Sequence, residues 1–319
     1  MKNLFLLLAV FIIFSSYTNS QEKNMDNPFF KEWSTPFQTP PFDEIKTDYY
    51  LPAFEEGIRL QKAEVDVIIN NTEKPTFVNT IEAMEKSSKP LTKVNSVFYN
   101  LNSANTNDEM QKIAKTVAPM LSKHNDDINL NEKLFARVKT IYSEKEKLNL
   151  TTEQKTVLKN YYDDFIRGGA NLNNEQKEKF RKINEELSLL SLKFGENLLK
   201  ETNSIGLIIE NKNDLAGLPE SVIQSAFELG KTKGHEGKWV FTLQKPSFIP
   251  FLQYSEKRNL REVIFKAYIN RGNNNNEFDN NKILSSIAAL RVERANLLGY
   301  KTHADYILEK NMAKNPETV

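Results

Sequence analysis

The sequence contains no cysteine and only three histidines among its 319 residues. Without cysteine there can be no disulfide, no thiolate metal site and no cysteine nucleophile. Three histidines leave few nitrogen ligands for a metal. Net charge is equally scarce, because 43 Lys and Arg stand against 42 Asp and Glu. This balance gives no electrostatic reason to expect a nucleic acid or an anionic membrane as a partner.

Glycine and proline are also few, at 11 and 12 residues, which favours helices over long linkers. The one long apolar run, Leu4 to Phe14, follows Lys2 and precedes small and polar residues. As a helix it would span about 16 Å, too short for a hydrocarbon core of about 30 Å. The pattern predicts a cleaved signal peptide over residues 1–20. We therefore expect a periplasmic or secreted protein, without a lipoprotein cysteine and without membrane contact after cleavage.

Three further regions follow this leader. Residues 21–46 carry four prolines and several aromatic residues, which predicts an extended N-terminal arm lying on the fold. Residues 47–200 show apolar residues at helical spacing throughout, and capping boxes are expected at Thr151–Gln154 and Asn173–Gln176. Residues 203–210 and 238–243 are the convincing strand candidates, so residues 201–319 are expected to hold a small sheet followed by more helices.

The most regular stretch is an apolar stripe between residues 180 and 198. Its members recur in steps of three and four: Phe180, Ile183, Leu187, Leu190, Phe194 and Leu198. Such a stripe suits either a coiled-coil partner surface or a core helix of a bundle. The number of heptads is too small to favour the coiled coil, so core packing is the prediction.

A hydrolytic zinc site of the HExxH type needs two histidines one helical turn apart and an intervening Glu as base. His235 and Glu236 begin such a pattern, but Trp239 occupies the place of the second histidine. Gly234 and Gly237 also argue against a helix there, so a solvated loop is predicted.

The other two histidines suggest no metal site either. His124 is expected near the end of a helix, exposed and close to its negative pole. His303 follows the potential cap Thr302, so capping or packing is expected of it. Phosphate-binding loops and serine-nucleophile elbows are missing from the sequence. We therefore assign no catalytic, cofactor-binding or metal-binding residue in this chain.

Several segments, in order, resemble one known family. The first half holds Asn27-Pro28-Phe29-Phe30, Thr39-Pro40-Pro41-Phe42-Asp43, Tyr50-Leu51-Pro52-Ala53-Phe54, Pro75-Thr76-Phe77-Val78-Asn79-Thr80-Ile81, Asn102-Ser103-Ala104-Asn105-Thr106 and Leu134-Phe135-Ala136-Arg137-Val138. The second half holds Glu236-Gly237-Lys238-Trp239-Val240, Leu260-Arg261, Tyr268, Arg271-Gly272, Leu290-Arg291, Arg294-Ala295, Leu297-Leu298-Gly299-Tyr300 and Met312-Ala313-Lys314. Together they are similar to the N-terminal half of bacterial peptidyl-dipeptidases, also called dipeptidyl carboxypeptidases, within the thimet oligopeptidase-like zinc metallopeptidases.

The resemblance implies an all-α, two-lobed fold of the thimet oligopeptidase and neurolysin kind, with a small accessory β-sheet near residues 203–243. It implies a monomer that holds one zinc ion when complete and removes dipeptides from the free C-termini of short peptides. In the family the zinc lies on an H-E-x-x-H helix with a downstream Glu. No residue of this chain matches those ligands. The chain is therefore expected to be truncated before the zinc site, to expose apolar surface and to be inactive alone.

Other functions stay open at this point. One alternative is a fragment of an oligopeptidase A-like endopeptidase. Another is a stand-alone, non-catalytic helical protein that binds peptides. A third is an interaction scaffold built on the apolar stripe at residues 180–198.

Overall fold

The structure, a computed structural model, describes residues 27–204 and 206–319. The predicted signal peptide and the first six residues of the predicted arm lie outside the described residues. The described chain is predominantly α-helical with one two-stranded sheet, which confirms the predicted fold class. It divides into two compact units. Unit 1 comprises residues up to Ser188 together with Arg294–Val319, and unit 2 is Leu189–Glu293.

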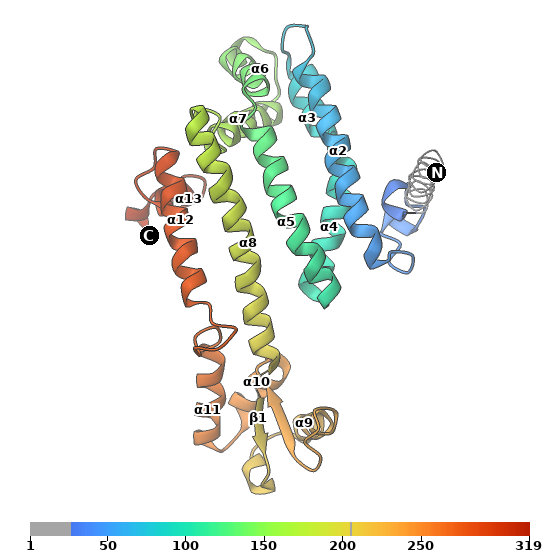
Figure 1. Ribbon diagram of the computed structural model, residues 1–319, viewed down its shortest axis with the longest axis vertical. Coiled ribbons are helices and arrows are strands. Elements are labelled where there is room, and N and C mark those ends of the chain that lie inside the picture. Colours follow the sequence, from blue (N-terminus) through green and yellow to red (C-terminus); the bar gives the residue numbers. More distant parts are fainter. Residues whose placement is uncertain (1–26, 205) are drawn as a thin grey trace, which may run out of the picture. The chain divides into compact units, whose positions relative to one another are not determined.

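Figure 1 shows the order of the elements along the chain. The helices of the first half are α2 (Tyr50–Ile69), the π-helix η4 (Phe77–Glu82), α3 (Ala83–Lys86), α4 (Lys89–Ala104), α5 (Asp108–Asn129), α6 (Glu132–Ser143) and α7 (Thr152–Arg167). The remaining elements are α8 (Asn174–Ser204), β1 (Gly206–Ile209), α9 (Glu220–Thr232), β2 (Trp239–Thr242), α10 (Lys245–Tyr254), α11 (Arg258–Ile269), α12 (Asn281–Leu297) and α13 (His303–Leu308). Two of the helices, α8 and α12, run from one unit into the other.

Capping side chains fix where the helices of unit 1 begin. Thr151 and Gln154 form the predicted capping box at the start of α7. Asn173 and Gln176 exchange hydrogen bonds of 2.9 and 3.1 Å at the start of α8, as the sequence also predicted. Each pair satisfies two backbone N–H groups that would otherwise lack partners in the first helical turn.

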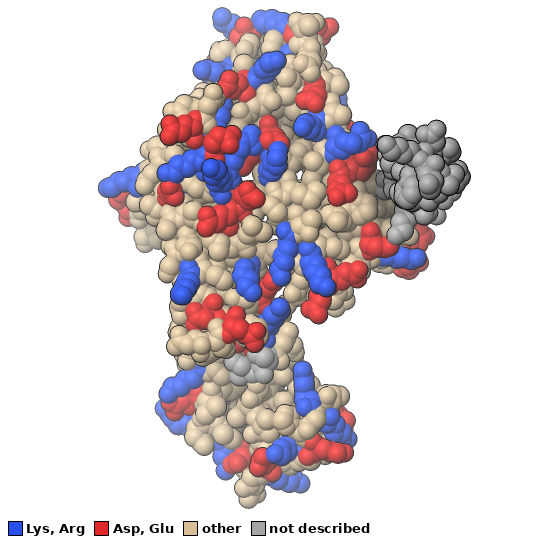
Figure 2. All heavy atoms as spheres, in the orientation of Figure 1, with Lys and Arg blue, Asp and Glu red and all other residues tan. Residues whose placement is uncertain are grey.

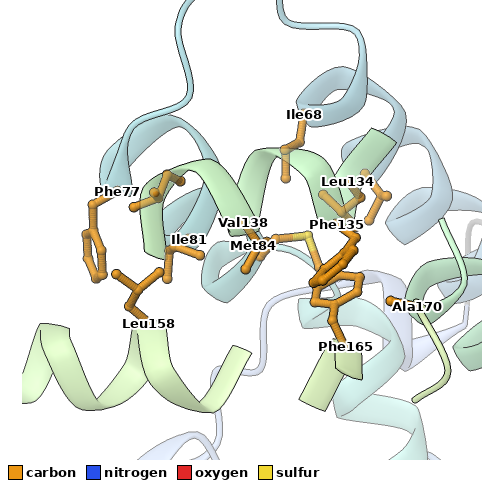
Figure 3. Packing of buried hydrophobic residues seen from close by; sticks show 12 residues of the cluster. Ile68, Phe77, Ile81, Met84, Leu134, Phe135, Val138, Leu158, Phe165 and Ala170 are labelled. Atoms are coloured by element: carbon orange, nitrogen blue, oxygen red, sulfur yellow. The ribbon is translucent and has the colours of Figure 1, made fainter. Parts of the chain in front are cut away.

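A large apolar core of unit 1 lies where α2, η4, α6 and α7 meet (Figure 3). Ile81, Leu134 and Leu158 are completely buried in it. Beside this core the buried Arg137 of α6 donates to the backbone oxygen of Asn71 at 2.8 Å and to Oδ1 of Asn79 at 3.1 Å. The guanidinium thus joins the loop at Asn71 to Asn79 of η4, which stabilises the turn leading into η4.

Residues 27–46 carry short 3₁₀ turns between extended residues, without an α-helix. Asn27 donates through Nδ2 to the backbone oxygen of Tyr49 at 2.9 Å. Phe29 is buried, with its ring 5.5 Å from that of Tyr50. The described part of the arm therefore packs on the N-terminal end of α2.

The apolar stripe of α8 packs in the core over its first half. Phe180, Ile183 and Leu187 are buried, which confirms the bundle-core prediction for these residues. Leu190, Phe194 and Leu198 are half-buried.

Unit 2 is built on the predicted small sheet. Strand β1 pairs antiparallel with β2, with Ile209 opposite Trp239 and Gly206 opposite Thr242. Both strands are shorter than predicted, and β1 starts later because α8 continues to Ser204. Helix α9 packs closely on β2 at Gly230, where a Cβ atom would lie 2.2 Å from the backbone oxygen of Lys238. Only glycine fits such an approach.

Helices α11 and α12 of unit 2 carry large apolar side chains at their surface. Phe265 and Ile269 of α11 are 47% and 57% exposed, and Leu284 of α12 is 55% exposed. No helix in the described part of the chain is both long and apolar enough to cross a membrane. The predicted division between residues 47–200 and 201–319 stays a prediction.

Candidate functional site

The three histidines lie in three separate elements. His124 is on α5, His235 is in the loop before β2, and His303 is the first residue of α13. Within residues 27–204 and 206–319, no three His, Cys, Asp or Glu side chains are grouped so that they could hold a metal ion. The donor set of the described chain therefore does not fit a zinc centre.

The local structure around two histidines agrees with the sequence. His235 lies in a loop with Gly234 and Gly237 on either side, both at a φ of 78°, so it is not on a helix. Thr302 caps α13 and accepts from the backbone N–H of Asp305, which makes His303 a first-turn residue. Its ring lies 6.2 Å from the ring of Tyr306.

The exposure predicted for His124 was wrong. His124 lies near the C-terminal end of α5, which ends at Asn129, as expected, but its side chain is only 4% exposed. Its Nε2 lies 2.7 Å from Oε1 of Gln61 on α2, which places the proton on Nε2. Burial lowers the pKa of His124, and Lys62 and Lys123 lower it further, whereas Asp127 raises it. His124 is therefore a neutral, inward-facing imidazole at neutral pH.

His124 lines a groove of about 790 Å³ within unit 1. The groove lies among the C-terminal ends of α2 and α5 and the N-terminal ends of α6 and α8. Its charged lining residues are Lys62, Asp66, Lys123, Asp127, Glu132, Lys133, Lys177 and Arg181. Nζ of Lys177 donates to Glu132 at 2.7 Å, and Nη1 of Arg181 donates to Asp127 at 2.7 Å. This volume falls in the range of small-ligand pockets.

A second cavity of about 650 Å³ lies between α5 and α8 and shares Lys123, Asp127 and Arg181 with the groove. Asp126, 5% exposed, lines it and accepts from Nδ2 of Asn184 at 2.8 Å. Burial raises the pKa of Asp126 to about 6, although Asn184 and Arg181 oppose the shift. Asp126 is thus a buried acid that changes its charge near neutral pH.

A third cavity of about 510 Å³ lies between α7 and the C-terminal segment of unit 1. Arg167 of α7 donates to the backbone oxygen of Tyr306 at 2.8 Å, and its guanidinium lies 4.2 Å from that ring. Arg167 also pairs with Glu309, which accepts from the Tyr300 hydroxyl at 2.7 Å. This cluster holds the C-terminal segment against α7, and we assign it a structural role.

Of the groove residues, only His124 was considered as a candidate from the sequence. The only signal was the polar run at residues 124–127, followed by Asn131-Glu132-Lys133 across a short break between helices. Lys177 and Arg181 lie about 50 residues further along and reach the groove only through the folding of α8 against α5. Such a grouping cannot be recognised from spacing alone.

Comparison with known proteins supports the resemblance predicted from the sequence. Residues 251–319 match the family model for Peptidase family M3. Over 291 residues, 91% of this chain, the sequence is 35% identical to a dipeptidyl carboxypeptidase of Escherichia coli. It is 32% identical over 284 residues to an oligopeptidase A of Haemophilus influenzae and 25% identical over 277 residues to a thimet-like oligopeptidase of Dictyostelium discoideum.

The aligned regions cover 88% and 86% of this chain for the last two proteins. They cover only 43%, 41% and 39% of the three relatives themselves. The chain therefore spans less than half the length of these relatives.

Proposed function

Because this chain is a relative of the M3 peptidases, we propose that it supplies the N-terminal helical part of an exported zinc metallopeptidase that releases dipeptides from the C-termini of short peptides. The observation that carries the proposal is the 35% identity to dipeptidyl carboxypeptidase over 91% of the chain. Export rests on the apolar leader at residues 4–14, which follows the layout of a signal peptide. The protein would act in the periplasm or outside the cell, as a monomer.

The zinc chemistry belongs to the complete enzyme and not to these 319 residues. The sequence has no second histidine one turn from His235, and the described residues hold no group fit for a metal. In this proposal the chain contributes helices that shape the space available to a peptide substrate. Within unit 1 the core around Ile81, Leu134 and Leu158 holds those helices in place.

Two other functions remain candidates on specific observations. The 32% identity to oligopeptidase A supports internal cleavage of peptides in place of dipeptide release. The lack of a metal-binding group in the described residues supports a stand-alone, non-catalytic helical protein that binds peptides.

The coding sequence after codon 319 separates the enzyme from the binding protein. An in-frame continuation that encodes H-E-x-x-H supports the enzyme. A stop codon with no such motif encoded after it contradicts the enzyme. Assays on the product then separate the two peptidases. We expect the longer product to release dipeptides from a peptide with a free C-terminus and to spare its amidated form, whereas cleavage inside the amidated peptide would favour the endopeptidase.

The 319-residue chain itself provides the matched control. It should hydrolyse neither peptide, with or without added zinc, because it lacks the ligands. Release of a dipeptide above the level of a chelator-treated sample would overturn the assignment of the zinc site to other residues.

A further inference from the structure

The lining of the groove of unit 1 has an excess of positive charge. Figure 2 shows basic and acidic side chains interspersed over the displayed face, without a large area of one sign. In the groove, by contrast, five cations face three carboxylates. Two C-terminal and two N-terminal helix ends border the groove, so the effects of their dipoles oppose one another. The charged side chains therefore determine the electrostatic potential in the groove.

The ion pairs in the groove leave part of this positive charge uncompensated. Asp127 accepts from Lys123 at 3.0 Å and from Arg181 at 2.7 Å, so one carboxylate serves two cations. Lys62 and Lys133 have no carboxylate partner within the described part of the chain. Asp66 is the remaining acid of the lining. An anion entering the groove would therefore meet ammonium groups that give up no existing ion pair.

Two of the lining side chains are built into the fold and are not mobile surface groups. Lys177 is 8% exposed and is held by Glu132, and His124 is 4% exposed and is held by Gln61. With its proton on Nε2, His124 presents Nδ1 as an acceptor that can take up a second proton. Two side chains that the fold holds in place beside one polar cavity favour a binding site over a solvated face.

We propose that this groove binds a small anion with at least two negative charges, such as a carboxylate-rich peptide or a phosphate compound, and that His124 takes up a proton when it binds. The free ammonium groups of Lys62 and Lys133 contact the ligand, together with Lys177 and Arg181. The charged groups that line the groove together with His124 are Lys62 and Asp66 from α2, Lys123 and Asp127 from α5, Glu132 and Lys133 from α6, and Lys177 and Arg181 from α8.

The proton uptake follows from this arrangement of charges. Burial is the main cause of the lowered pKa of His124; Asp127 opposes the shift, and the ammonium groups of Lys62 and Lys123 add to it. A bound anion screens these ammonium groups and attracts the imidazolium, so the pKa of His124 rises. Linkage then requires that the anion binds more tightly at low pH, where His124 is already protonated. The proposal is independent of the peptidase activity and of zinc.

Calorimetric titration of the full chain with two probes tests the proposal at low ionic strength. The probes are the peptide Glu-Glu-Glu and inorganic pyrophosphate, with Gly-Gly-Gly and acetate as negative controls. We expect binding of at least one probe, strengthened several-fold between pH 7.5 and pH 6. Binding of the peptide alone identifies a peptide ligand, and binding of pyrophosphate alone identifies a phosphate ligand. Failure of both probes to bind at about millimolar concentration overturns the proposal.

A matched pair of double variants locates the site. Lys62→Gln with Lys133→Gln should weaken binding at least tenfold. Lys89→Gln with Lys139→Gln removes the same charge from exposed positions outside the groove and should change the affinity less than twofold. Equal losses in the two double variants would show nonspecific attraction and would contradict the site.

The imidazole itself can be observed without any substitution. The NMR signal of the His124 ring should titrate at a higher pH when the bound probe saturates the protein. The ring signal of His235, which lies in a loop outside the groove, serves as the internal reference. Addition of the probe should leave this signal unchanged. An unchanged titration of His124 would refute the proton uptake even if the anion binds.

Discussion

Each of the two units contains a buried carboxylate whose pKa is shifted, and these two shifts have opposite directions. Asp126 of unit 1 is 5% exposed, and Glu201 of unit 2 is completely buried. Burial raises the pKa of both side chains. In Asp126 burial outweighs the opposing interactions, and the pKa rises to about 6. In Glu201 the opposing interactions outweigh burial, and the pKa lies below its ordinary value. Burial alone therefore does not decide the charge of an interior acid.

The difference lies in the donors that each carboxylate meets. Asp126 accepts a single hydrogen bond in the described part of the chain, from Asn184 at 2.8 Å. Glu201 accepts from the backbone N–H of Gly272 and from Asn274 and Asn276, whose amides lie 2.8 and 2.6 Å from Oε1. Donors aimed at the ionised form favour that form and outweigh desolvation. The loop after α11 thus directs several donors at the ionised carboxylate of Glu201, whereas Asp126 of α5 has a single donor.

The two acids should give opposite dependences of stability on pH. Glu201 has a lowered pKa, so its contribution is present above the unfolded value of 4.5 and is lost as the pH falls through its folded value. Asp126 has a raised pKa, so its contribution is present below 3.8 and is lost as the pH rises through about 6. The substitutions below separate these two effects.

The largest effect is expected from Glu201→Gln. The neutral amide points an NH₂ group at donors that now face a carboxylate oxygen, so at least one buried donor loses its acceptor. The free energy of unfolding should fall by about 3 kcal/mol at pH 7, because hydrogen bonds to charged groups are worth about 1.5–3 kcal/mol. Urea unfolding measures the loss. Glu186→Gln, at an exposed position of the same helix, is the control and should stay within about 0.5 kcal/mol of the parent.

Asp126→Asn should act in the opposite direction near neutral pH. It removes the buried charge and can keep the Asn184 hydrogen bond through its own Oδ1. Two pKa units correspond to at most about 3 kcal/mol of stability lost by the parent between pH 4 and pH 6. The variant should lack this decline, and thermal unfolding at several pH values measures it. If the stability of the variant declines with pH as steeply as that of the parent, a group other than Asp126 causes the decline. Glu109→Gln on the same helix is the control.

The sequence predicted the fold well because its signals are local. Thr151 with Gln154 and Asn173 with Gln176 are three residues apart, and each pair caps a helix in the structure. The same holds for the strand at Trp239 and for the loop at His235, where two glycines exclude a helix. These features depend on neighbours along the chain.

The site could not be predicted in the same way because it depends on distant contacts. His124 was expected to be exposed, since the polar run after it resembles a helix end. Its burial depends on Gln61, 63 residues away on α2. The charge state of Glu201 likewise depends on Asn274 and Asn276, which lie more than 70 residues further along the chain.

The smallest effect is expected from Asn276→Ala, which removes one of the donors to Glu201 and leaves the charge in place. The cost should be about 1 kcal/mol at pH 7, the worth of one hydrogen bond. The pKa of Glu201 should rise toward its ordinary value, because one group that favours the ionised form is gone. Loss of stability on acidification should therefore begin at a higher pH than in the parent, as followed by urea unfolding between pH 3 and pH 6. Ser286→Ala, at an exposed position of α12, is the control and should leave that onset unchanged. If Asn276→Ala shifts the onset no more than this control does, Asn276 does not set the charge of Glu201, and the contrast with Asp126 must come from Asn274 and the Gly272 N–H.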